Sequence, residues 1–138
     1  MTTRDAELAR GAFEAWEEGT LPEYAERHVH PDLEFHDAPE MPDAQLVRGR
    51  YEALARMDSY MELLGRFSIP VCEVEQRSEG VFVRVTPSGR APASGVTVEW
   101  EVFCVMRFRD GLMVEIRNYF DRDTALAVAD VDRSVAAR

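Results

Sequence analysis

The sequence contains no lysine: its 16 basic residues are all arginine, and they face 26 aspartates and glutamates. The formal net charge is therefore −10 at pH 7. A surface of this sign repels nucleic-acid phosphates and anionic lipid headgroups. We therefore expect neither nucleic acid nor a membrane surface as a partner, and small or neutral molecules are favoured.

Long apolar runs are also missing. No stretch approaches the roughly 18 apolar residues of a membrane span, and the N-terminus lacks the apolar segment of a signal peptide. Cysteine is scarce, with only two in the chain. Cys72 and Cys104 both fall in strand-like segments, which favours two reduced, buried thiols over a disulfide. These absences predict an intracellular, cytoplasmic protein.

The 138 residues fit one domain, because a chain of this size buries roughly two-thirds of its unfolded surface. Periodic apolar positions run from about residue 5 to 130 and are absent from both ends. We expect a single domain over 1–138, frayed at 1–4 and with a flexible tail at 131–138.

Three amphipathic helices are predicted in the first half of the chain. The first, within 5–18, repeats apolar residues including Phe13 and Trp16 at helical spacing. The second lies within 20–29 and ends before Pro31. The third spans 49–67, with Gly65 near its end and an apolar stripe of Leu54, Met57, Met61 and Leu64.

After the third helix, apolar residues recur at every second position instead of at helical spacing, which predicts strands. A short strand at 32–37 precedes them, two more are expected at 71–76 and 81–86, and a short helix at 123–130 closes the chain. Helices early and strands late indicate an α+β fold. We expect a cone: a curved antiparallel sheet of about five strands, wrapped around the three N-terminal helices and enclosing a cavity, as in cystatin-like α+β barrels.

Segment 96–121 carries the clearest local signal. Asp110-Gly111 between two alternating segments predicts a β-hairpin, because both central residues of a type I′ turn need positive φ. Alternation gives one face Val96, Val98, Trp100, Val102, Cys104, Met106 and Phe108 from the first segment, with Val114, Ile116, Asn118 and Phe120 from the second. A single amide in an apolar row is typical of a pocket wall that also orients a polar group.

The order of elements, together with segments 30–39, 47–50 and 109–121, resembles SnoaL-like members of the nuclear-transport-factor-2-like superfamily. The resemblance covers about residues 8 to 130. It implies a cone-shaped fold shared by ketosteroid isomerase, polyketide cyclases, scytalone dehydratase, limonene epoxide hydrolase and non-catalytic binders, so the fold alone leaves the function open.

The resemblance also implies roles for individual residues. Asp37 matches the isomerase carboxylate that acts as general base. The positions of the isomerase's two oxyanion donors fall near Phe13 and on Cys104, which are not such donors. The acid of the epoxide hydrolase falls on Asn118, which has no acidic proton. Neither mechanism transfers intact.

The residues themselves leave two roles open at the end of the first strand. Asp37 would act as a base if an apolar pocket raised its pKa, and otherwise it caps the turn before Pro39. His36 is a second catalytic candidate, but strand alternation sends it to the face opposite Asp37 unless a bulge intervenes. Solvent or an interface is the expected surrounding of His36.

Further residues are candidates for binding the substrate. Asn118 would hold a carbonyl or a water, or would bond a neighbouring loop. Phe13, Trp100, Cys104, Met106 and Phe108 would line the pocket. Tyr51 and Asp58 share one flank of the third helix, where one of them would reach the cavity mouth and where solvation is the simpler expectation.

His28, His30 and Glu34 fit a His-x-His-x3-Glu metal spacing. Such ligands converge on a β-hairpin, whereas His28 ends a helical segment and Pro31 interrupts the run. We expect no metal centre and no cofactor.

The leading functional hypothesis is a cofactor-independent tailoring enzyme of the cyclase, isomerase or dehydratase type, acting on an apolar, carbonyl-containing, polyketide- or steroid-like metabolite. The alternatives are a non-catalytic binder of a hydrophobic ligand with the same fold, and an epoxide hydrolase. A homodimer is expected from the resemblance, with Phe103 and Val105 on the outer sheet face as its apolar patch.

Overall fold

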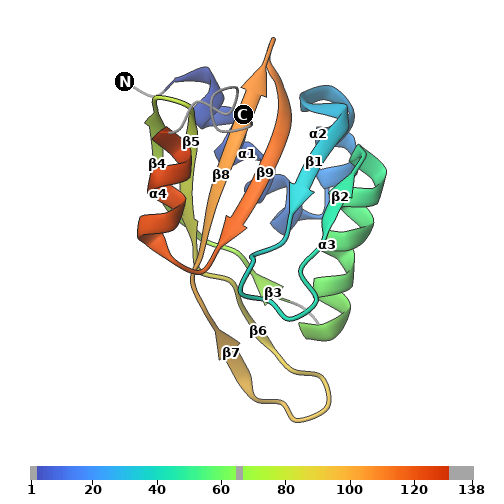
Figure 1. Ribbon diagram of the computed structural model, residues 1–138. Coiled ribbons are helices and arrows are strands. Elements are labelled where there is room, and N and C mark those ends of the chain that lie inside the picture. Colours follow the sequence, from blue (N-terminus) through green and yellow to red (C-terminus); the bar gives the residue numbers. More distant parts are fainter. Residues whose placement is uncertain (1–2, 65–66, 131–138) are drawn as a thin grey trace.

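The computed structural model describes residues 3–64 and 67–130 (Figure 1). The predicted tail at 131–138 and the predicted helix end at Gly65 lie outside these residues. The described residues form the helices α1 (Arg4–Glu18), α2 (Leu21–His28), α3 (Arg50–Leu64) and α4 (Arg122–Asp130). None of these helices is long and apolar enough to cross a membrane.

Six strands form the main sheet and three form a small second sheet. In spatial order the main sheet comprises β2 (Leu46–Arg48), β1 (Val29–His36), β9 (Leu112–Tyr119), β8 (Val102–Arg109), β5 (Gly80–Val85) and β4 (Val71–Arg77). The second sheet comprises β3 (Phe67–Ser68), β6 (Ser88–Arg90) and β7 (Thr97–Glu99).

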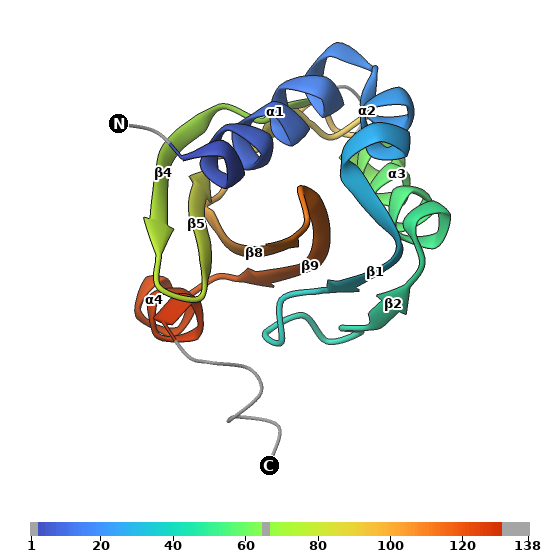
Figure 2. The ribbon, with the colours of Figure 1, turned by 90° about the horizontal axis from the view of Figure 1, so that it is seen from above.

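The main sheet curves, and helices α1, α2 and α3 close the side that it leaves open (Figure 2). Apolar residues from these helices and from the concave face of the sheet form the larger of the two buried clusters. This arrangement confirms the predicted α+β fold with a curved sheet around three N-terminal helices. It places the core, and any space within it, inside a cone.

The residues at the start of α1 and in the turn between β8 and β9 show the local structure that their residue types favour. The Thr3 side chain accepts a hydrogen bond from the Ala6 amide and caps α1, so the helix already begins at Arg4 instead of after a frayed segment. Asp110 and Gly111 have φ angles of 54° and 78°, as a type I′ turn requires. The predicted hairpin of β8 and β9 is confirmed.

The prediction of a purely antiparallel sheet is wrong at one place. β1 pairs with β9 in parallel, while the other pairings of the sheet are antiparallel. Side-chain alternation does not encode the direction of the neighbouring strand, so the pattern gave no sign of this pairing. The parallel pair matters for the site, because it brings the end of β1 beside Asn118.

The long strand predicted from Val96 is two strands. β7 pairs with β6 in the small sheet and β8 pairs with β5 in the main sheet, with the break at Trp100 and Glu101. Val96 lies before β7 and is exposed. The two halves of one alternating segment therefore belong to different sheets.

A register shift between Arg107 and Phe108 changes which residues of β9 share a face with those of β8. Met106 opposes Ile116, whereas Phe108 opposes Met113. Met113 is therefore the residue that joins Ile116 on the concave face, and the prediction for Val114 is wrong. A bulge of this kind cannot be read from alternation alone.

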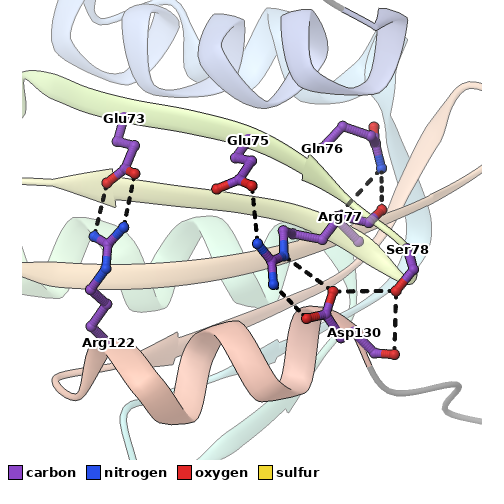
Figure 3. Close-up of polar contacts among 8 residues, drawn as sticks. Glu73, Glu75, Gln76, Arg77, Ser78, Arg122 and Asp130 are labelled. Atoms are coloured by element: carbon purple, nitrogen blue, oxygen red, sulfur yellow. Dashed lines mark hydrogen bonds and ion pairs between the residues drawn. The ribbon is translucent and has the colours of Figure 1, made fainter.

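Helix α4 covers the outer face of the sheet. Ala125 and Ala129 pack on Phe82, Phe103 and nearby residues in a second buried cluster. Two clamps hold the helix to β4 (Figure 3): Arg122 pairs with Glu73 through two hydrogen bonds of 2.8 and 2.9 Å, and Arg77 pairs with Asp130 through two of 3.1 and 2.6 Å.

The apolar patch predicted for a dimer is therefore not on the surface. Phe103 and Val105 are only 5% and 0% exposed, because α4 lies over them. Cys72 was also predicted to be buried and is exposed, because it lies on the edge strand β4. Cys104 is buried as predicted, and both thiols are free.

Candidate ligand-binding site

The cone contains a cavity of about 320 Å³, lined almost entirely by apolar side chains. Helices α1, α2 and α3 form one side of it, and β1, β8 and β9 form the other. Five of the residues predicted for the site line it: Phe13, Trp100, Cys104, Met106 and Asn118. Large neighbours in the wall include Trp16, Leu33, Phe35, Met57, Tyr60, Met113, Ile116 and Phe120.

The other predicted site residues do not line the cavity. Tyr51 is 60% exposed and its hydroxyl donates a hydrogen bond of 3.4 Å to Glu26, while Asp58 is also exposed. Each helical residue is turned by about 100° from the one before it. Among the side chains of α3 that the structure describes, Arg50, Ala53, Leu54, Met57 and Tyr60 border the cavity, whereas Tyr51 and Asp58 lie on the outside. Phe108 packs at the edge of the core instead.

Asp37 is buried behind the cavity wall, and both oxygens of its carboxylate accept hydrogen bonds. Its Oδ2 lies 2.5 Å from Nη2 of Arg56 and accepts a hydrogen bond of 3.0 Å from the Gln45 amide. Its Oδ1 accepts a short hydrogen bond from the Tyr60 hydroxyl. The carboxylate thus faces α3, and Tyr60 stands between it and the cavity.

These bonds set the pKa of Asp37. Burial alone raises the pKa, but the hydrogen bonds from Arg56, Tyr60 and the Gln45 amide stabilise the charged form more strongly, and the net pKa lies below the usual value. A general base works best when its pKa lies near the operating pH. The raised pKa on which the role of Asp37 as a free base depends is not found, and its catalytic role stays a prediction.

His36 lies on the opposite face of the strand end, as alternation predicts. Its Nε2 is 3.4 Å from a carboxylate oxygen of Glu34, and Glu115 completes a cluster whose ligand atoms lie within 4.8 Å of one another. Burial and the neighbouring Arg117 guanidinium lower the pKa of His36. Arg117 and Arg107 both pair with Glu115, at 2.9 and 3.4 Å, so this carboxylate is already held by two arginines of the same chain.

Of the three residues with the metal-like spacing, only Glu34 belongs to that cluster. The His28 ring packs on Tyr24 with centroids 4.7 Å apart, and His30 Nδ1 accepts a hydrogen bond of 3.0 Å from the Asp32 amide. Glu34 instead faces His36. His28, His30 and Glu34 therefore make no common ligand set.

Two polar side chains of the cavity wall meet at the end of β1. Asn118 Nδ2 donates a hydrogen bond of 2.8 Å to the His36 carbonyl, and the Tyr60 hydroxyl donates to the carboxylate of the next residue, Asp37. Because these partners are consecutive residues at the end of β1, Tyr60 and Asn118 place their polar groups at the same end of the apolar cavity, which we call the polar corner.

Cys104 completes this corner. Its thiol donates to Asn118 Oδ1 at 3.1 Å, and burial raises the pKa of the thiol to about 12. The thiol is therefore neutral and serves as a hydrogen-bond donor rather than as a nucleophile. Together with the His36 carbonyl it fixes the orientation of the Asn118 amide.

Sequence reasoning missed Tyr60, Arg56 and Arg50. Tyr60 follows Met57 by three positions and so shares its side of α3, a spacing that would have placed it in the cavity. The role of Arg56 can be recognised only from its contact with Asp37, which lies 19 residues away in the sequence. Arg50 ends the segment 47–50 that carries part of the family resemblance, but nothing in the sequence indicates that this residue borders the cavity.

The fold and cavity define a class: α+β cones that enclose an apolar, ligand-sized space. Residues 9–116 match the SnoaL-like domain family, and the chain belongs to that family. The family resemblance drawn from the sequence is thereby confirmed. No curated protein matches the chain.

Solved structures with the same fold cover nearly the whole chain. A proposed SnoaL-like polyketide cyclase from Jannaschia sp. CCS1 is 17% identical with a TM-score of 0.75, over 94% of this chain and 93% of that one. IdmH, a proposed polyketide cyclase from Streptomyces antibioticus, is 23% identical with a TM-score of 0.71, over 91% and 97%. TerC co-crystallised with polyporic acid is 16% identical with a TM-score of 0.72, over 92% and 98%. At these identities the likeness shows the fold alone.

Proposed function

We propose that the protein binds a small, mostly apolar molecule inside the cone, with a hydroxyl or carbonyl group of that molecule at the corner formed by Tyr60 and Asn118. The observation that carries this proposal is the cavity itself: about 320 Å³, apolar walls and one polar corner. Its size falls within the roughly 300–1,000 Å³ of ligand pockets, which are typically apolar with a few placed polar groups.

The hydrogen bonds of the corner define which ligand groups fit it. Tyr60 donates its proton to Asp37, and its oxygen also accepts from the Arg56 guanidinium, so one lone pair of that oxygen remains for a ligand hydroxyl. Asn118 donates one amide hydrogen to the His36 carbonyl, and its second amide hydrogen is available for a ligand carbonyl. Asp37 and Arg56 act as positioning residues for Tyr60.

A steroid- or polyketide-like ligand suits this site best. Fused or linked rings fill an apolar space between aromatic walls and carry the hydroxyl and carbonyl groups that the corner receives. Two structural neighbours are proposed polyketide cyclases, and a third was crystallised with polyporic acid, which supports the same ligand class for this chain.

Tryptophan fluorescence tests the proposal, because the chain has two tryptophans and both Trp16 and Trp100 line the cavity. Titration with progesterone and with polyporic acid is expected to change this emission saturably. Ala53→Phe fills the cavity from α3 and is expected to abolish the change. Ala55→Phe, on the exposed side of the same helix, is the matched control. Equal binding by both variants would place the ligand elsewhere.

A tailoring reaction is the second candidate, carried by the contact between Tyr60 and Asp37. In such a reaction the Tyr60 oxygen takes a proton from a carbon next to a ligand carbonyl, while the Tyr60 proton moves to Asp37. The lowered pKa makes Asp37 a weak proton acceptor, so the step depends on stabilisation of the enolate that forms. Asn118 would hold the carbonyl. Tyr60→Phe is then expected to stop turnover of a cyclisable polyketide or an enone while binding persists. Turnover that survives in Tyr60→Phe would exclude this route.

An epoxide-hydrolase reaction is not proposed. It needs a carboxylic acid that faces the substrate. Among the residues that the structure describes, none of those lining the cavity is an aspartate or a glutamate.

A further inference from the structure

The cavity has two different ends, because β1 and β9 run in parallel along its wall (Figure 1). Val29 lies opposite Met113 where both strands begin, and His36 lies opposite Arg117 where both strands finish. The polar groups of the corner bond to the last residue of β1 and to the residue after it. The polar corner therefore lies at the end of the cavity where β1 and β9 finish.

The end where the two strands begin is closed and apolar. Ala25, Val29 and Met113 line the cavity there, and none of them is more than 6% exposed. Arg50 borders the same end, but its guanidinium donates to the Val29 carbonyl and to the Tyr51 hydroxyl. A ligand oxygen at this end would lie among apolar side chains, and burying a polar group without a hydrogen bond is costly.

The end that holds the polar corner is open to solvent beside Phe120. Among the described residues that line the cavity, only Phe120 is exposed, at 43%, and the others are buried or half-buried. Phe120 follows Asn118 by two positions, so it lies just beyond the corner. Its backbone N–H donates to the Glu40 carboxylate at 3.2 Å, and Met41, the next residue of that loop, also lines the cavity. The mouth and the polar corner are therefore at the same end.

We infer that the ligand enters the cone with its apolar end first and keeps its carbonyl at the mouth. This inference rests on the proposed ligand-binding function and narrows its ligand class. The apolar part lies between the polar corner and the closed end, and the five residues of β9 from Met113 to Asn118 limit its length to about 17 Å.

This orientation defines which substituents the ligand can carry. A carbonyl that accepts from Asn118 has its next bond at the mouth, where an attached chain passes Phe120 into solvent. The ligand class therefore includes esters and amides whose polar part stays outside the cone. A long polar chain at the opposite end of the ring system is disfavoured, because either the chain or the carbonyl would then lie at the closed apolar end.

Three amides of one ring system test the orientation on the full chain. They are biphenyl-4-carboxamide, its N-linked triethylene glycol derivative, and the isomer that carries the same chain at the 4′ position of the far ring. Tryptophan fluorescence measures their affinities. We expect the first two to bind within about threefold of each other, and the 4′ isomer to bind at least about 10-fold more weakly than the N-linked one.

Cross-linking locates the mouth directly. Cys72→Ser provides the background, because it removes the exposed thiol. In that background Phe120→Cys places a thiol at the mouth, whereas Asp110→Cys places one in the turn between β8 and β9, where β9 begins. An N-linked bromoacetyl derivative of the amide should label the first variant at least about 10-fold faster than the second, after each rate is divided by that with iodoacetamide. Excess biphenyl-4-carboxamide should suppress the fast labelling.

The outcomes separate this inference from the proposed function. Equal binding of the two isomers, equal corrected labelling of the two cysteine variants, or binding of progesterone without binding of any of the amides would overturn the inference and leave the cavity function standing. Failure of every probe to bind, progesterone and polyporic acid included, would overturn both. Circular dichroism checks folding, and Met41→Cys provides a second thiol at the mouth if Phe120→Cys does not fold.

Discussion

The carboxylate of Asp37 lies 2.5 Å from the guanidinium of Arg56, and its side chain is 0% exposed. This pair ties the end of β1 to the middle of α3. The Arg56 guanidinium also stacks 5.5 Å from the centre of the Tyr60 ring. The residue that the family resemblance suggested as a base therefore holds a tyrosine in the cavity wall.

Asp37→Asn tests how much this ion pair contributes to the stability of the folded protein. The substitution removes the negative charge and leaves Arg56 with a largely buried, uncompensated charge, so we expect the free energy of unfolding to fall by about 3 kcal/mol. Urea denaturation measures it. Asp43→Asn is the control, because Asp43 is 71% exposed and 4.0 Å from Arg56, and it is expected to change stability by less than about 0.5 kcal/mol. Equal effects of the two substitutions would contradict the account.

The lowered pKa of Asp37 predicts how stability depends on pH. The folded state holds this carboxylate ionised below the roughly 3.9 of an unfolded aspartate. Its contribution is therefore complete above that value and is lost as the pH falls through the folded-state pKa. The stability difference between wild type and Asp37→Asn should narrow below about pH 4. A difference that stays constant in acid would show that folding does not lower the pKa of Asp37.

The two cysteines should differ in reactivity. Cys72 is exposed, whereas Cys104 is buried with its pKa raised to about 12. Because the thiolate is the reactive form, Ellman's reagent at mild alkaline pH should modify Cys72 quickly and Cys104 only after unfolding. The Cys72→Ser variant should then show almost no native-state reaction. Rapid native modification of Cys104 would contradict its burial.

Helix α4 should keep the outer sheet face from self-association. Ala125→Glu places a charge in the contact with the sheet, where Ala125 is 0% exposed, and is expected to cost about 2–4 kcal/mol and to uncover Phe82 and Phe103. Sedimentation should then show concentration-dependent association. Ala127→Glu changes the exposed side of the same helix and should behave as wild type. A homodimer remains a prediction, through a surface other than the one beneath α4.

Features encoded by neighbouring residues were predictable from the sequence. The Asp110-Gly111 turn was predictable because positive φ is a local property of those two residues. The helices of the first half followed from apolar spacing in the same way. Cys104 and Asn118 were predicted to share one face, but their pairing depends on the register shift between Arg107 and Phe108, which neither alternation nor the turn encodes.

Features that depend on distant residues were not predictable. The pKa of Asp37 depends on Arg56 and Tyr60, 19 and 23 residues further along. The burial of Val105 depends on a helix that begins at Arg122. Composition and alternation describe a residue's own strand or helix, whereas these properties arise when separate elements pack together.

A crystal structure of the full chain grown with progesterone would test the central claim most directly. We expect the steroid inside the cone against Trp100 and Met106, with one of its oxygens within hydrogen-bond distance of Asn118 Nδ2. The two Asp37 contacts, to Arg56 and to Tyr60, should be unchanged. A steroid bound only on the outer surface, with side chains filling the cavity, would contradict the account.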